Sequence, residues 1–144
     1  QPSPLNITRM MWSWQSGYKF VRIDTKTTGR PNGYVLHLGS AGCKTDEAQK
    51  TTCVNANRPE FVFSKFDPAK DVIDVDLKAL YAAANVDINQ EKTAAGCMSA
   101  PDDSDCKPVF TSLGLAFGGE KPASQTFMRV EKLPKGSAGT TTKR

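Results

Sequence analysis

Apolar and polar residues alternate in short runs along much of the chain, which is the pattern of β-strands. The clearest runs are residues 18–24 and 34–38, and the polar stretch between them ends in Asn32-Gly33, a strong hairpin signal. We therefore expect these two runs to pair as antiparallel strands. The same reasoning predicts three further short strands, at residues 61–63, 72–75 and 125–133.

Helical signals are few. Residues 5–14 carry apolar side chains at helical spacing and are expected to form about two turns that end before Gly17. Asp76 is expected to cap a short helix over residues 76–84, and residues 108–115 to form another helical turn. Short strands with so little helix predict an all-β fold, an antiparallel β-sandwich with short helical turns and two disulfide-closed loops.

The 144 residues fit one domain. We expect a β-sandwich domain at residues 1–135 and a flexible tail at 136–144, which is small, polar and basic. A sandwich of so few strands would leave long unpaired edges, so we expect it to be the C-terminal part of a longer domain. No apolar run approaches the roughly 20 residues that span a bilayer.

The charge pattern argues against nucleic acid as a partner. The net charge is +4, but the 19 basic and 15 acidic residues are spread along the whole chain. The basic residues cluster only near the end, at Lys132, Lys135, Lys143 and Arg144. A nucleic-acid-binding protein would show a basic stripe with aromatic or helical organisation, and none is visible.

The four cysteines fall into two local pairs, Cys43 with Cys53 and Cys97 with Cys106. Three connectivities are possible in principle, and local pairing is favoured because short loops are closed at low entropic cost. The alternative, a thiolate zinc site, is weakened by spacings of nine and eight intervening residues, where a zinc knuckle uses two to four. Two disulfides would place the protein in an oxidising compartment, a periplasm or the cell exterior.

His37 is the only histidine of the chain, and it falls on a predicted strand. It is either a half-buried strand histidine with hydrogen-bond partners or a ligand suited to copper or zinc. One histidine does not make a specific site, so further ligands must come from Met10, Met11, the Trp12 region or another chain. Thioethers suit Cu(I), although adjacent methionines are more often core filler.

Other candidate chemistry is weaker. Asp102, Asp103 and Asp105 could hold Ca²⁺, but they lack the glycine and the distal glutamate of an EF-hand, which favours a solvated acidic loop. No Gly-rich phosphate loop, Ser-His-Asp order or His-Glu-x-x-His motif is present, so hydrolytic catalysis has little support and we expect no enzyme. The two tryptophans, Trp12 and Trp14, either seal one end of a sandwich or belong to a site.

Several local sequences occur in a characteristic order: Trp12-Ser13-Trp14-Gln15-Ser16-Gly17-Tyr18-Lys19-Phe20, His37-Leu38-Gly39-Ser40-Ala41-Gly42-Cys43, Cys53, Asn57-Arg58-Pro59, Phe66-Asp67-Pro68, Gly96-Cys97-Met98-Ser99 and Asp105-Cys106. Together they resemble the MbnP-like proteins, the four-Cys member of the "metallo-mystery pair" system. The resemblance runs from about Leu5 to Val130.

This resemblance implies a periplasmic or secreted copper protein of bacteria that pairs with a diheme enzyme of the cytochrome c peroxidase/MauG type. That partner oxidises the first tryptophan of the Trp-x-Trp motif to kynurenine, which joins a histidine in a Cu(I) site. Carried onto this chain, Trp12 is the modified residue and a metal ligand, and His37 is a second ligand. Trp14 and Met11 would lie beside the site. The chain would then be substrate and copper binder, not catalyst.

Members of the family are longer and carry an N-terminal half with more strands and usually another histidine. We therefore expect a further copper ligand outside these 144 residues, and the N-terminal part of the same protein as a docked chain. The alternative function is a structural or interaction β-domain of an oxidising compartment, with calcium bound by the acidic cluster. An enzyme that uses an oxidised tryptophan as its redox cofactor is the third hypothesis.

Overall fold

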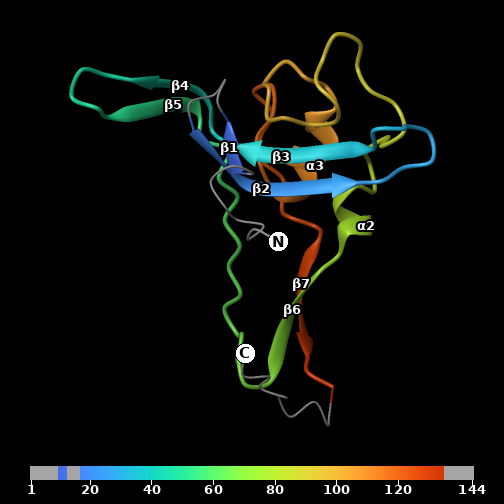
Figure 1. The fold of residues 1–144 in the computed structure, drawn as a ribbon. Coiled ribbons are helices and arrows are strands. Elements are labelled where there is room, and N and C mark those ends of the chain that lie inside the picture. The colour runs from blue at the N-terminus through green and yellow to red at the C-terminus, as the bar shows by residue number, and fades with distance from the viewer. Residues whose placement is uncertain (1–9, 13–16, 135–144) are drawn as a thin grey trace, which may run out of the picture.

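The computed structural model describes residues 10–12 and 17–134. Their elements, in chain order, are β1 (Met11–Trp12), β2 (Gly17–Thr25), β3 (Tyr34–Gly39), β4 (Ala41–Thr45), β5 (Thr51–Asn55), β6 (Asp71–Val75), α2 (Leu77–Leu80), α3 (Cys106–Leu113) and β7 (Met128–Lys132). The strands form three antiparallel sheets, β1-β2-β3, β4-β5 and β6-β7 (Figure 1). The all-β class is confirmed. Because the sheets of the described residues are separate, a closed β-sandwich stays a prediction.

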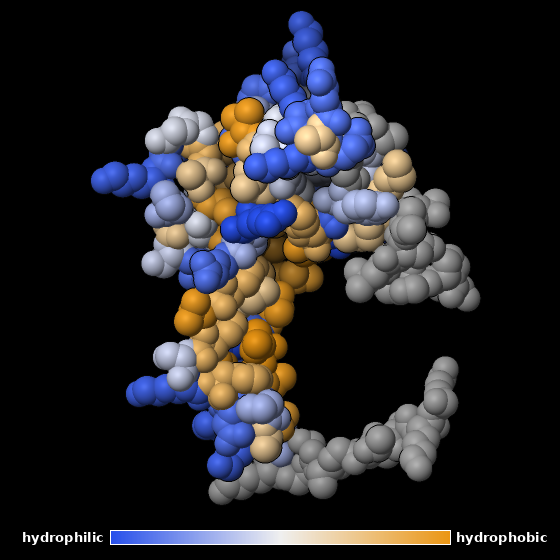
Figure 2. All heavy atoms as spheres, turned by 90° about the vertical axis from the view of Figure 1, so that its left-hand side faces the viewer, coloured by the Kyte–Doolittle hydropathy of each residue, from blue (hydrophilic) through white to orange (hydrophobic). Residues whose placement is uncertain are grey.

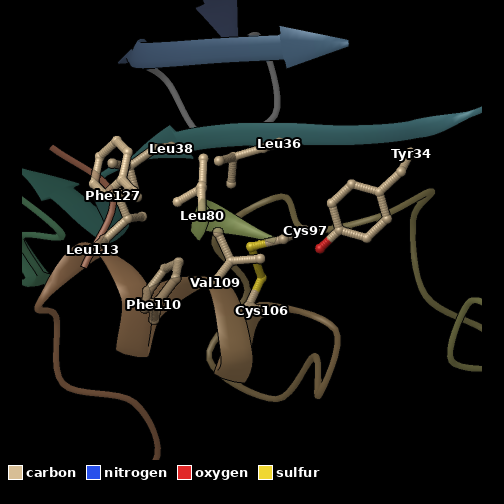
Figure 3. Packing of buried hydrophobic residues seen from close by; sticks show 10 residues of the cluster. All are labelled: Tyr34, Leu36, Leu38, Leu80, Cys97, Cys106, Val109, Phe110, Leu113 and Phe127. Atoms are coloured by element: carbon tan, nitrogen blue, oxygen red, sulfur yellow. A yellow bond between two sulfur atoms is a disulfide. The ribbon is translucent and has the colours of Figure 1, made fainter. Parts of the chain in front are cut away.

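The core lies between one face of β3 and helix α3. Leu36 and Leu38 point from β3 toward Val109 and Leu113 on the helix (Figure 3), and all four side chains are at most 4% exposed. Alternation along β3 supplies one apolar face, and α3 supplies an apolar stripe at helical spacing. The opposite face of β3 is therefore available for a different use.

Both edges of β3 are hydrogen-bonded, which makes it a rigid platform. One edge pairs with β2. Along the other edge, His37 N donates to the Cys97 carbonyl at 2.9 Å and Cys97 N donates to the Val35 carbonyl at 2.9 Å. The segment before Cys97 approaches β3 so closely that residue 96 must be a glycine, because a Cβ on Gly96 would lie 2.3 Å from the Val35 carbonyl oxygen.

Both predicted disulfides are confirmed, in two different settings. Cys97–Cys106 is fully buried and ties the segment beside β3 to the start of α3 (Figure 3). Cys43–Cys53 joins directly opposed residues of β4 and β5. The first cysteine loop is therefore a two-stranded ribbon that projects from the body (Figure 1), which the sequence analysis missed.

One predicted element is wrong within the described residues, and another ends earlier than predicted. In the helix predicted at 5–14, Met10 is helical, but Met11 and Trp12 form β1, because this short strand pairs with the start of β2 and the Trp12 side chain is buried. Residues 61–63 are not a strand, since they have no partner strand. Phe61 packs edge-on against Phe127, with ring centroids 5.7 Å apart, while Val62 is 77% exposed.

The remaining predictions differ from the structure only in their bounds. Helix α2 is short, and the Asp76 side chain caps it by accepting from Ala79 N at 2.9 Å, as predicted. Helix α3 begins at Cys106, two residues before the predicted start. The predicted tail at 136–144 and most of the helix predicted at 5–14 lie outside the described residues.

The β6–β7 sheet forms an arm that runs away from the body (Figure 1) and carries exposed apolar side chains. In Figure 2, hydrophobic residues gather along this lower part of the molecule. The exposed fractions of Val72, Ile73, Val75, Val130 and Leu133 are 38–45%. An apolar ribbon of only two strands has little support of its own. Among the described helices, none is long and apolar enough to cross a membrane.

Candidate metal centre

The candidate centre lies on the face of the β1-β2-β3 sheet that points away from the core, and a bulge in β2 determines which side chains reach it. Arg22 is opposite His37 and Lys19 is opposite Gly39, with a shift of register between Lys19 and Val21. Directly opposed residues of an antiparallel pair share a face. Simple alternation would place Lys19 on the core face with Val21, but the extra residue of a bulge reverses the alternation. Lys19 therefore lies on the face of His37.

Trp12 is brought to the same place by β1, which pairs with the start of β2. The indole is 4% exposed, and its ring centroid lies 6.3 Å from that of His37, with an angle of 54° between the planes. It occupies the space where residue 39 has no side chain, since a Cβ on Gly39 would be 2.7 Å from Cζ3 of Trp12. The structure thus brings together the two residues that the sequence analysis singled out as ligands.

The His37 side chain is 11% exposed in the folded chain. Within the described residues, neither Nδ1 nor Nε2 has a hydrogen-bond partner, although both are buried. Nε2 lies 3.6 Å from Oδ1 of Asp24, but that carboxylate is held by Arg22, whose Nε donates to Oδ2 at 2.9 Å. Leaving a buried polar atom without a hydrogen-bond partner lowers the stability of the folded state, so these two nitrogens require an explanation.

Burial lowers the pKa of His37, and the positive charges of Lys19 and Arg22 lower it further, against a smaller opposing effect of Asp24. The imidazole is therefore kept neutral. A neutral imidazole offers one lone pair, which is the form that binds copper or zinc. The unpartnered nitrogens of His37 fit a metal ligand better than they fit a hydrogen-bonded strand histidine.

Two residues far along the chain hold the end of β3 in place. Ser99 Oγ accepts from Gly39 N at 3.1 Å and donates to the His37 carbonyl at 2.9 Å. Asn57 Nδ2 donates to the Gly39 carbonyl at 2.9 Å. Ser99 and Asn57 both have positive φ, 61° and 49°. Residues in that region are uncommon and are kept where the surrounding structure requires them.

The sequence analysis missed the roles of Lys19, Ser99 and Asn57. Ser99 and Asn57 occur in stretches that carry the resemblance, which was the only signal for them. Lys19 also occurs in such a stretch, but its place on the face of His37 had no signal, because a bulge is not visible in the alternation of residues.

Other candidate ligands are placed less favourably. Met11 is 49% exposed, whereas Met10 is 8% exposed. Trp14 lies outside the described residues. In residues 10–12 and 17–134, no group of three or more His, Cys, Asp or Glu side chains could hold a metal ion. The described part of the chain thus offers one histidine donor beside a buried indole.

The acidic cluster gives the calcium alternative no support. Asp103 Oδ1 accepts from Asp105 N at 3.0 Å, and Asp105 Oδ2 accepts from Gln90 N at 2.9 Å. Asp102 is exposed. Among the described residues, these carboxylates fix local turns and do not converge on a common point where a cation would sit.

Fold and site together define a disulfide-stabilised β-protein with a buried Trp–His pair. The model of the MbnP family matches residues 1–99, and the chain belongs to this family. The solved structure of MbnP from Methylosinus trichosporium is similar, with 32% sequence identity and a TM-score of 0.73. The similarity covers 93% of this chain and 53% of that one, so the chain spans about half the length of the solved protein. No curated protein matches the chain.

Proposed function

We propose that this chain is part of a periplasmic or secreted bacterial protein that binds Cu(I) in copper homeostasis, through His37 and a kynurenine formed from Trp12. The observation that supports the proposal is the buried imidazole of His37, whose nitrogens have no hydrogen-bond partner among the described residues and whose ring centroid lies 6.3 Å from that of the buried indole of Trp12. Membership of the MbnP family and two disulfides, which persist in oxidising compartments, agree with it.

The conversion of Trp12 would turn a side chain without a metal-binding lone pair into one that has two donor groups. In the net reaction two equivalents of hydrogen peroxide remove four electrons, the C2–C3 bond of the indole breaks with one oxygen added to each carbon, and two water molecules are released. Hydrolysis then releases formate and leaves an aryl amine and a ketone. The net change is one oxygen gained and one carbon lost. The amine and the imidazole are both nitrogen donors of the kind that copper accepts.

The oxidising equivalents would come from a diheme partner of the cytochrome c peroxidase/MauG type. Because the Trp12 indole is only 4% exposed, such a partner would act by removing electrons through the intervening protein and not by direct contact. The chain is thus proposed as the substrate of that enzyme and as a binder of copper.

We further propose that polypeptide equivalent to the unmatched part of solved MbnP covers the apolar arm and supplies the remaining copper ligand. The arm exposes Val72, Val75 and Val130, and the solved protein contains about as much sequence again as this chain matches. A partner strand would bury these side chains and pair an open sheet edge.

Native mass spectrometry of protein from its natural host should detect this additional polypeptide, in the same chain or bound to it. A lone chain of 144 residues that binds copper tightly would contradict the proposal.

The main experiment uses the natural full-length protein, produced in a periplasm with and without the diheme partner. Peptide mass analysis should show one oxygen gained and one carbon lost at Trp12 only when the partner is present. His37→Ala should abolish Cu(I) retention and leave this modification in place, while Met11→Leu, which changes an exposed thioether, should keep both. An unmodified Trp12 peptide from protein made with an active partner would overturn the kynurenine. Copper retention that survives His37→Ala would overturn the metal site.

A further inference from the structure

The Lys19 side chain places a positive charge on the face that carries His37. Its residue is 8% exposed, and the bulge in β2 places it opposite Gly39, next to the strand position of His37. Gly39 and His37 are alternate residues on one face of β3, so Lys19 is a diagonal neighbour of His37 across the strand pair. Lysine is almost never buried without a partner, because its ammonium group is strongly hydrated.

No carboxylate among the described residues forms an ion pair with Lys19. The neighbouring acid is Asp24, but its carboxylate forms an ion pair with Arg22. Nε and Nη2 of the guanidinium both donate to Oδ2, at 2.9 and 2.6 Å. Arg22 and Asp24 thus largely cancel each other. The charge of Lys19 is not balanced by a carboxylate among the described residues, so these three side chains together carry one net positive charge near His37.

We propose that Lys19 makes the site at His37 select metal ions by charge, favouring a monovalent over a divalent ion. The inference rests on the proposed function and adds the source of its selectivity. Imidazole alone does not discriminate in this direction, since divalent copper and zinc bind nitrogen donors strongly. Coulomb repulsion from Lys19 is proportional to the charge of the ion, so it opposes a divalent ion twice as much as a monovalent one.

The proportionality gives a specific signature in binding constants. If replacement of Lys19 by a neutral residue strengthens monovalent binding by some factor, divalent binding should rise by about the square of that factor. The ratio of monovalent to divalent affinity then falls by the same factor, on the order of tenfold for one charge at a distance of several ångströms. General changes in packing or stability would alter both affinities alike.

The experiment uses the full-length protein with Ag(I) and Zn(II) as redox-inert monovalent and divalent probes, each measured by competition with a chelator of known affinity. Lys19→Met removes the charge at similar length, and Lys19→Gln does so with different packing. Both variants should lower the Ag(I)/Zn(II) ratio, whereas Lys19→Arg should keep it. Lys50→Met, at an exposed position next to β5, is the control for loss of a positive charge elsewhere.

The outcomes separate the two hypotheses. An unchanged ratio in Lys19→Met and Lys19→Gln, with silver binding that still depends on His37, overturns the selectivity and leaves the proposed metal site standing. Silver binding that is unaffected by His37→Ala overturns the metal site and the selectivity together. An equal fall of the ratio in Lys50→Met would show an effect of net charge and would also overturn the role of Lys19.

Discussion

The indole of Trp12 lies over Gly39, and each residue depends on the other. A Cβ at position 39 would come within 2.7 Å of Cζ3 and 3.3 Å of Cε3 of the ring. The absence of a side chain at Gly39 lets the indole approach β3 and lie beside His37, two residues earlier on the same face. The position of the residue proposed for oxidation therefore depends on one glycine of the neighbouring strand.

Replacing Gly39 with alanine should displace the Trp12 ring and destabilise the protein. Forcing extra volume into a packed contact costs about 1–3 kcal/mol. Urea unfolding should show this loss, and peptide mass analysis should show less modified Trp12. In a Trp12→Leu background, where the ring is absent, the same Gly39→Ala change should cost clearly less. Equal costs in the two backgrounds would mean that the two residues do not contact each other.

Ser99→Ala should destabilise the protein and loosen the end of β3 that carries His37. The hydroxyl satisfies the Gly39 N–H and the His37 carbonyl, which lie 60 and 62 residues away in sequence, and Ser99 is 2% exposed. Leaving buried polar groups unpaired costs about 1–3 kcal/mol each. Amide hydrogen exchange should increase at Gly39.

Ser112→Ala is the matched control for Ser99→Ala. Ser112 is also buried, but its hydroxyl donates to the Pro108 carbonyl of its own helix, at 3.2 Å. Its removal should cost less and leave exchange at Gly39 unchanged. A similar effect of both substitutions would remove the special role assigned to Ser99.

The two disulfides should differ in their contribution to stability although their loops are nearly equal in length. The sequence separations are 10 for Cys43–Cys53 and 9 for Cys97–Cys106, so loop closure contributes roughly 3 kcal/mol to each. Cys97 and Cys106 are fully buried in the core, whereas the other pair lies in a projecting ribbon. Replacing Cys97 and Cys106 with alanine should therefore lower the free energy of unfolding more than replacing Cys43 and Cys53. The reverse order in urea titrations would contradict the assignment of the core.

Acid should weaken the β6–β7 arm through Asp71. Its carboxylate accepts from Lys132 Nζ at 2.5 Å and from Asp67 N at 2.8 Å, and these two bonds lower its pKa in the folded chain. Because the pKa is lower than in the unfolded chain, the stabilisation is fully present above the unfolded value of about 4. It is lost as the pH falls below that value and through the folded pKa.

The measurement for Asp71 is the urea midpoint at neutral and acid pH. Asp71→Asn should be less stable than the natural sequence at neutral pH, and the difference should shrink as the pH falls below about 4. Asp102→Asn, which changes an exposed carboxylate, is the control. A difference that does not vary with pH would mean that the carboxylate charge is unimportant there.

The strands that the sequence predicts are those with a local signal. Residues 18–24 and 34–38 pair antiparallel as expected, because alternation and an Asn32-Gly33 turn report the backbone state of the segments themselves. Phe61 and Val62 have the same local signal but no strand beside them among the described residues, so the prediction fails there. The disulfides were predictable for the same reason as the hairpin, since their partners are close in sequence.

Residue type alone indicated that Trp12, His37 and the four cysteines are the candidates for ligand and disulfide chemistry, since indole, imidazole and thiol side chains are few in this chain. Only the tertiary structure decided how these groups are arranged. The shift of register in β2 moved Lys19 to the face of His37, and a serine 60 residues along the chain from Gly39 closed the hydrogen bonds of β3. The physical reason is that periodicity describes a segment by itself, whereas register and long-range contacts depend on which segments meet.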